Sequence, residues 1–166
     1  KTEDMYIDIG ASDKQSALGL VSPGDTVAFD IEPGLFGEGL FKAKAIDDRV
    51  GCAALLKLIE EGPAVDTWFV FTVMEEVGGR GAFGATFALK PDIALIVEGT
   101  TAADIPDVDA HKRVCAVGGG VVLPFMDRGT IYDRAVFEGL RSLAQEKSIP
   151  WQLKSYVSGG TDASSV

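Results

Sequence analysis

The sequence predicts an α/β protein whose sheet carries helices on both faces, preceded by a short β-rich segment. From Lys42 onward, runs of β-branched and aromatic residues alternate with helical stretches, which is typical of a layered α/β fold. Residues 1–40 instead hold short alternating runs between Gly and Pro turns, which is typical of part of a small β-barrel or β-rich insert. We therefore expect two domains, residues 1–40 and residues 41–166.

The β-rich segment contains few elements. Residues 5–9 and 26–30 each alternate like a short strand, and residues 12–18 have the length of one or two helical turns. Three strands at most are present, which is too few to close a barrel. We therefore expect only part of a barrel here.

Three helices are predicted after the β-rich segment. Residues 50–61 follow two aspartates that can cap a helix, and Gly62-Pro63 ends it. Residues 81–89 and 131–147 have the composition and apolar spacing of two further helices. The inward faces are expected at the following positions: Leu55, Leu56, Leu58 and Ile59 in the first helix, and Val136, Leu140, Leu143 and Ala144 in the last.

Strands are predicted between these helices. Residues 67–73 and 92–97 are apolar β-rich runs, which is typical of central strands covered on both faces. The other strands are expected at residues 42–46, 121–125 and 151–157.

The charge balance limits the classes of function. Lys and Arg number 15 against 25 Asp and Glu, a net charge of −10. A nucleic-acid binder normally presents a basic face, so that class is not expected. No apolar run approaches the ~18 residues that span a membrane. We expect a cytoplasmic enzyme without a membrane partner, and we expect residues 1–166 to be part of a longer protein.

Acidic residues recur where predicted strands end. Asp47-Asp48 follows the first short run, Glu75-Glu76 the second and Glu98 the third. Ligand crevices of α/β sheets lie at the carboxyl ends of strands, and crowded carboxylates repel one another unless a cation offsets their charge. In an extended chain, adjacent side chains point to opposite sides, so one Glu can bind metal while its neighbour handles a proton. Each pair taken alone is more typical of a helix cap or a solvated loop.

Four motifs in this order resemble the dinuclear metallo-aminopeptidases of the TET and glutamyl-aminopeptidase (deblocking aminopeptidase) family. They are residues 44–51 (KAIDDRVG), 75–82 (EEVGGRGA), 98–102 (EGTTA) and 159–163 (GGTDA). The resemblance implies a three-layer α/β/α peptidase domain with a mixed sheet, interrupted by an inserted β-barrel. It also implies peptide substrates and a homo-oligomer, typically a dodecameric shell.

The resemblance implies a role for each matching residue. Asp47 would bridge two divalent metal ions, zinc or cobalt being expected, and Asp48 would follow it across a peptide bond that is often cis. Glu76 and Glu98 would each bind one metal, and Glu75 would be the general base acting on a water held by both. Gly159 and Gly160 would lie along the substrate backbone, while Asp162 is expected to support that loop.

The family completes each metal site with a histidine that has no counterpart among these residues. His111 is the only histidine and matches neither motif. We therefore expect residues 1–166 by themselves to bind zinc weakly and to be inactive. The sequence leaves two alternatives open, a glycosidase acting through paired carboxylates and a non-catalytic assembly fragment. It also leaves open which N-terminal residue is preferred.

Overall fold

A computed structural model describes residues 2–166, with the Thr2 side chain left out of the description. The chain divides into two compact units, Lys1–Lys44 and Ala45–Val166. That the first unit belongs to an inserted barrel stays a prediction.

The first unit contains one short helix and one hairpin. Its elements are η1 (Thr2–Asp4), α1 (Lys14–Leu18), β1 (Gly34–Phe36) and β2 (Leu40–Lys42). β1 and β2 pair antiparallel with Leu35 opposite Phe41. The helical turn expected at residues 12–18 is confirmed as α1. The strands expected at residues 5–9 and 26–30 are wrong, because a strand requires a hydrogen-bonded neighbour and these runs have none among the described residues.

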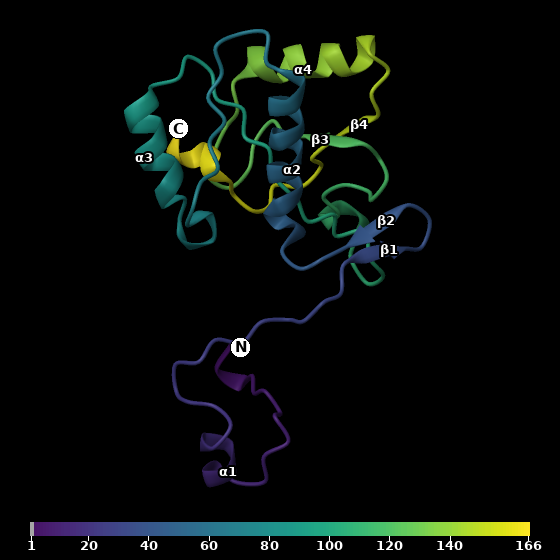
Figure 1. Ribbon diagram of the computed structural model, residues 1–166. Coiled ribbons are helices and arrows are strands. Elements are labelled where there is room, and N and C mark those ends of the chain that lie inside the picture. The colour runs from purple at the N-terminus through teal and green to yellow at the C-terminus, as the bar shows by residue number, and fades with distance from the viewer. Residues whose placement is uncertain (1) are drawn as a thin grey trace. The chain divides into compact units, whose positions relative to one another are not determined.

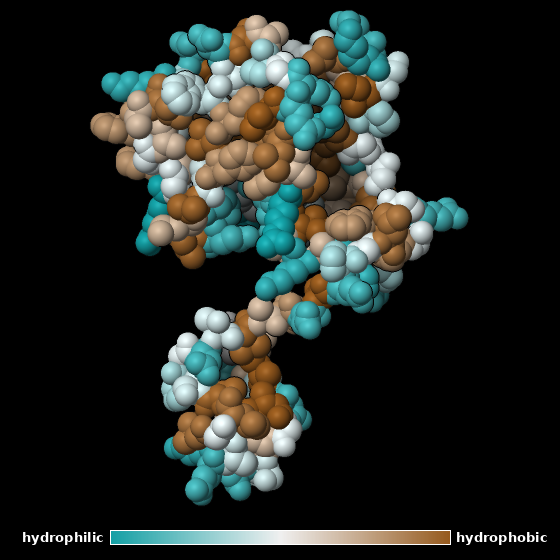
Figure 2. All heavy atoms as spheres, in the orientation of Figure 1, coloured by the Kyte–Doolittle hydropathy of each residue, from teal (hydrophilic) through white to brown (hydrophobic). Residues whose placement is uncertain are grey.

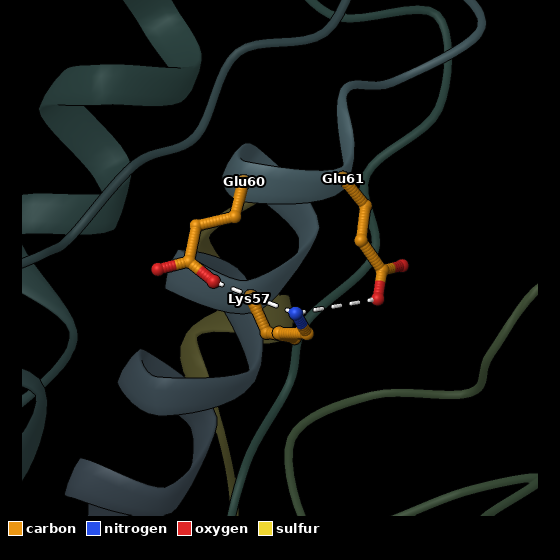
Figure 3. Close-up of polar contacts among 3 residues, drawn as sticks. All are labelled: Lys57, Glu60 and Glu61. Carbon is orange, nitrogen blue, oxygen red and sulfur yellow. Dashed lines mark hydrogen bonds and ion pairs between the residues drawn. The ribbon is translucent and has the colours of Figure 1, made fainter.

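The three helices predicted for the second unit are confirmed (Figure 1). They are α2 (Ile46–Glu61), α3 (Arg80–Leu89) and α4 (Arg134–Glu146). The exposed end of α2 carries ion pairs from Lys57 Nζ to Glu60 and Glu61, at 3.5 and 3.8 Å (Figure 3). Such pairs add a few tenths of a kcal/mol to a helix. No helix in the described part of the chain has the length and apolar character needed to span a bilayer.

The sheet of the second unit is small. β3 (Val121–Leu123) and β4 (Trp151–Leu153) pair in parallel, with α4 in the connection between them and packed against β3. The α/β class is therefore confirmed, but the strands expected at residues 42–46, 67–73 and 92–97 do not form as predicted. The last two form no strand ladder among residues 2–166. Strand formation depends on a pairing partner and not on β propensity alone.

Few apolar side chains are buried in this unit. Ala82, Val114 and Ala144 are buried, whereas Leu56 of α2 is 55% exposed. Brown, hydrophobic side chains are visible at the surface over α2 and α3 in Figure 2. The expected inward faces are therefore wrong for most of their positions, because a helix buries its apolar face only where another layer covers it. The exposed members are Leu56, Leu58, Ile59, Leu140 and Leu143; Leu55 and Val136 are half-buried.

The start of α4 yields a stability prediction. The Asp133 side chain accepts a hydrogen bond from the Val136 backbone N–H at 2.9 Å. Asp133→Ala leaves this N–H without its cap and should lower the free energy of unfolding by ~0.5–2 kcal/mol, measured by urea denaturation. Asp133→Asn keeps a capping oxygen and is the matched control. Equal losses in the two variants would contradict the capping role.

Candidate functional site

An acidic cavity of about 630 Å³ lies within the unit Ala45–Val166. Its walls come from five parts of the chain. Four of its lining residues are acids from three separate segments: Asp47, the adjacent pair Glu75 and Glu76, and Glu98. Backbone of Gly159 and Gly160 lines it as well. Tertiary structure thus brings the acids singled out in the sequence to one place.

Asp47 and Asp48 lie where α2 begins. The peptide bond between them is cis, and both have non-helical backbone angles. Asp48 Oδ1 accepts a hydrogen bond from the Gly51 backbone N–H at 3.0 Å. A Cβ atom on Gly51 would overlap the Asp48 carboxylate and would lie 2.6 Å from the Val97 carbonyl oxygen. Glycine is therefore required where this turn approaches the segment that leads to Glu98.

Three carboxylates form a cluster at this end of the cavity. One oxygen each from Asp47, Asp48 and Glu98 lies within 4.8 Å of the other two. Glu98 Oε1 also accepts a hydrogen bond from the Gly99 N–H at 3.0 Å. We call these three residues the carboxylate trio. Its oxygens are close enough together to hold one cation.

Burial, with a smaller contribution from neighbouring charges, raises the pKa of Glu98 and of Asp48. Burial is the main reason that the pKa of Glu98 rises to about 8, and its hydrogen bond with Asp47 and the charge of Asp48 add to the rise. Burial also raises the pKa of Asp48, to which the Asp47 charge contributes, whereas its hydrogen bond from Gly51 lowers it. A proton held between carboxylates does electrostatically what a cation would do.

Glu75 and Glu76 lie on a tight turn beside the trio. They open η2 (Glu75–Val77), and the Glu75 carbonyl accepts hydrogen bonds from the N–H groups of Gly78 and Gly79. Glu75 is half-buried and Glu76 is exposed. Burial, followed by the charges of Glu76 and Asp162, raises the pKa of Glu75. The two neighbouring glutamates therefore differ in environment, as a division of roles requires.

The trio in the structure shares two of its three residues with the metal ligands predicted from the sequence. Asp47 and Glu98 belong to the trio, but its third member is Asp48, and Glu76 lines the cavity outside the trio. Asp48 had been interpreted only as the neighbour of Asp47. His111 lies exposed on η3 (Ala110–Lys112) and does not line the cavity. The ligand role of Glu76 and the base role of Glu75 stay predictions.

Asp162 joins the glycine loop to the segment that carries Glu75. It begins η4 (Asp162–Ser165), is buried, and its Oδ2 accepts a hydrogen bond from Thr72 Oγ1 at 2.6 Å. Gly79 has a φ of +62°, and a Cβ there would lie 3.2 Å from Asp162 Oδ1. η4 also packs against α3. The loop and the Glu75 turn therefore share one support.

A second support, which sequence reasoning missed, is built on Asp127. Its buried carboxylate accepts hydrogen bonds from the N–H groups of Gly129 and Thr130, both at 2.7 Å, and from the Tyr132 hydroxyl at 2.6 Å. The next N–H, of Arg128, donates to the Gly159 carbonyl at 3.0 Å. Burial and the bond to Asp127 raise the pKa of Tyr132 to about 12. The Asp-Arg-Gly-Thr string is typical of an Asx-turn and was the available signal.

Glu98 yields a pH prediction. Because its pKa in the folded protein is about 8, above its ordinary value of 4.5, the folded state binds more protons than the unfolded state between these values. The free energy of unfolding of the metal-free protein should therefore fall as pH rises through this window. Glu98→Gln cannot ionise, so it should flatten the fall in urea denaturation at pH 5–9. Glu146→Gln, on the exposed end of α4, is the control.

The wild type and Glu98→Gln must be compared over the same pH range. An identical pH slope in the two proteins would contradict the raised pKa. Binding of a divalent cation favours the ionised trio, so a saturating cation should remove most of the slope in the wild type.

Curated relatives of the chain are aminopeptidases. A provisionally named aminopeptidase of Acetivibrio thermocellus is 41% identical over 164 residues, 98% of this chain and 49% of the relative. A glutamyl aminopeptidase of Lactococcus lactis is 31% identical, with 86% of this chain and 40% of the relative covered. A lysyl aminopeptidase of Pyrococcus furiosus is 28% identical, with 97% and 46% covered. The chain spans about half the length of the curated relatives it matches or less.

Several solved structures that share this fold are aminopeptidases or related peptidases. Aminopeptidase APDkam598 of Desulfurococcus kamchatkensis matches with a TM-score of 0.83 and 36% identity, over 96% of this chain and 46% of that one. The Pyrococcus horikoshii TET1 peptidase, which can assemble into a tetrahedron or a large octahedral shell, matches at 0.69 and 30% over 96% and 48%. A Thermotoga maritima structure titled endoglucanase matches at 0.56 and 36% over 69% and 37%.

The comparison with family models covers the whole sequence. The model of the M42 glutamyl aminopeptidases matches residues 1–166. Solved aminopeptidase structures share the fold, and the family model matches the whole sequence. The chain therefore belongs to the M42 glutamyl aminopeptidase family.

Proposed function

We propose that the protein is a metal-dependent aminopeptidase that removes N-terminal residues from peptides at the acidic cavity. The observation that supports this proposal is the carboxylate trio, which crowds three acids within reach of one cation and leaves Glu75 beside it on a separate turn. Membership of an aminopeptidase family supplies the reaction class. Binding of divalent cations and release of N-terminal residues are the two measurements that test it.

The trio fits a divalent cation. Burial, followed by the hydrogen bond with Asp47 and the charge of Asp48, raises the pKa of Glu98, and a cation would stabilise the ionised form of the same oxygens. Asp47, which lines the cavity together with Glu76 and Glu98, is proposed to bridge two ions, with Glu98 on one and Glu76 on the other. Oxygen-only donors accept manganese or cobalt as well as zinc.

Zinc is expected to bind weakly to residues 1–166 by themselves. Among the described residues no histidine lines the cavity, and zinc favours nitrogen or sulfur donors. We therefore keep the prediction that this stretch alone is inactive. An aminopeptidase assay of residues 1–166 in the presence of zinc, cobalt or manganese tests it.

The chemistry divides between the ions and the chain. The bound ions would hold the free α-amine and polarise the scissile carbonyl. Glu75 is proposed to take a proton from the attacking water at its carboxylate and to return it to the leaving amine. Burial and neighbouring charges raise the pKa of Glu75, which brings a carboxylate closer to the range useful to a general base. Gly159 and Gly160 are proposed to hold the substrate backbone.

The glycosidase alternative has less support. Glycosidases keep their two carboxyl groups about 5–9.5 Å apart, to make room for the sugar or for a water. The trio instead places one oxygen from each of three acids within 4.8 Å of the others, an arrangement that suits a shared cation. The aminopeptidase relatives also outnumber the single endoglucanase title among the matches reported above.

Assembly and location are proposed from the family. Since the TET1 peptidase can form a tetrahedron or an octahedral shell, we propose that the whole protein is a large homo-oligomer as well. Size-exclusion chromatography with light scattering tests this. A cytoplasmic location, and the absence of nucleic-acid and membrane partners, stay predictions from composition.

Glu75→Gln tests the proposed base. The amide keeps the shape of the side chain but cannot accept the proton, so kcat should fall by roughly 10²–10⁴ while cation affinity changes little. Initial rates of the full-length protein on leucine p-nitroanilide and calorimetric titration with Mn²⁺ measure the two quantities. Glu60→Gln, an exposed ion-pair partner on α2, is the control. A fall in kcat below about threefold would contradict the assignment.

Asp47→Asn tests the cation site without any need for turnover. Removing the charge of the proposed bridging residue should lower Mn²⁺ affinity by roughly 10–100-fold, in line with the loss of a ligand-shell interaction. The measurement is calorimetric titration of protein first stripped with a chelator. Asp66→Asn, an exposed acid outside the cavity, is the control. Unchanged affinity in Asp47→Asn would remove Asp47 from the site.

A further inference from the structure

The acidic cavity contains a buried, positively charged side chain that has no role in the proposed reaction. Lys154 follows β4 directly, lines the cavity and is only 9% exposed. Lysine is almost never this deeply buried unless it is paired. Its position at the carboxyl end of a parallel strand is where α/β folds bind ligands.

The backbone around Lys154 is fixed from two sides. The Lys154 N–H donates to the Leu123 carbonyl at 3.3 Å, which extends the parallel pairing of β3 and β4. The next N–H, of Ser155, donates to the carbonyl of buried Val114 at 2.9 Å. The ammonium group donates to the Ser158 carbonyl at 2.7 Å. The side chain is therefore held in place before any ligand arrives.

The ammonium group has binding capacity left over. The ammonium group has three N–H donors, and the Ser158 carbonyl is its one protein acceptor among the described residues. No carboxylate of the described residues lies within 4.0 Å of it. A buried ammonium without a counter-ion is unfavourable, and an anionic ligand group would relieve it.

Lys112 shows the contrast within the same cavity. It lines the wall too, but its Nζ pairs with Asp109 at 2.7 Å, and its side chain is 54% exposed. Lys112 is already neutralised and solvated, whereas Lys154 is neither. The cavity thus combines four lining acids with one buried lysine that has no carboxylate partner among the described residues.

We propose that Lys154 binds a carboxylate of the peptide substrate. This inference rests on the proposed aminopeptidase function and adds the substrate class to it. The acids of the cavity suit the free α-amine, and Lys154 suits an anionic group on the same molecule. That group is either the side chain of an N-terminal Glu or Asp, or the C-terminal carboxylate of a short peptide. The relatives include both a glutamyl and a lysyl aminopeptidase, so family membership alone does not decide the preference.

The test measures binding in a protein carrying Glu75→Gln, so that turnover is prevented. Four peptides are titrated: Glu-Ala-Ala-amide, Gln-Ala-Ala-amide, Ala-Ala-Ala with a free carboxylate, and Ala-Ala-Ala-amide. A charge-assisted contact at Lys154 should make one acid bind roughly 10–100-fold more tightly than its neutral partner. The Glu/Gln pair reports the side-chain source, and the acid/amide pair reports the C-terminal source.

Three variants locate the effect. Lys154→Met keeps the apolar stem and should bring the preferred ratio close to one, whereas Lys154→Arg should retain most of it. Lys112→Met is the matched control and should leave the ratio unchanged. A native protein without either preference, or an equal weakening of all four peptides in Lys154→Met, would overturn the proposal in favour of a structural role. Circular dichroism melting checks that each variant is folded.

A separate assay keeps the two proposals distinguishable. Cleavage of either leucine p-nitroanilide or glutamate p-nitroanilide by the full-length native protein tests the aminopeptidase function, whichever of the two is preferred. Charge-dependent peptide binding without cleavage of either substrate would overturn the proposed function and retain the carboxylate site. Cleavage without charge-dependent binding would do the reverse.

Discussion

Mutual repulsion among carboxylates is the constraint on which the candidate site depends. Asp47, Asp48 and Glu98 place oxygens within 4.8 Å of one another, close to Glu75 and Glu76. Charges of one sign at this separation destabilise a fold unless a proton or a cation lies between them. This destabilisation is concentrated where the segments that carry the three acids come together. Burial is the main reason that the pKa of Glu98 rises to about 8, and the neighbouring carboxylates add to the rise.

The surrounding polar network opposes that repulsion by fixing the acids through their backbone. Gly51 anchors Asp48, and the η2 turn directs Glu75 and Glu76 into neighbouring but different environments. Asp162 ties the glycine loop to Thr72, just before that turn. Asp127 orders a second turn that contacts Gly159. Rigid supports of this kind hold catalytic groups in a fixed geometry, which is what a hydrolytic site needs before substrate binds.

The cavity is also asymmetric in charge. Its acidic side suits cations and a free amine, whereas Lys154 offers a buried positive group elsewhere on the wall. A ligand that carries charges of both signs would match both sides at once. In the proposals above, the reaction depends on the carboxylates of the sequence motifs. The preference for one peptide over another depends on Lys154, which lies outside those motifs.

The sequence by itself determined the family, the helices and the acids. Helices depend on local contacts and caps, so residues 50–61 and 81–89 were readable from spacing, Asp and Gly-Pro signals. The motifs around Asp47, Glu75, Glu98 and Gly159 pointed to one cavity before any coordinates. Strand pairing could not be read in this way, because the β propensity of residues 67–73 does not specify a partner.

Only the tertiary structure decided which side chains meet. It placed Asp48 in the trio instead of Glu76, buried Asp127 as a support, and enclosed Lys154 without a carboxylate partner. Two of these results depend on contacts between segments far apart in sequence, Asp48 with Glu98 and Lys154 with Leu123. The Asp127 turn is local, but its contact with Gly159 through the Arg128 N–H is not. Residue type and local spacing carry no record of such contacts. The sequence therefore determined which functional groups are available to the site, and the fold determined how those groups are arranged.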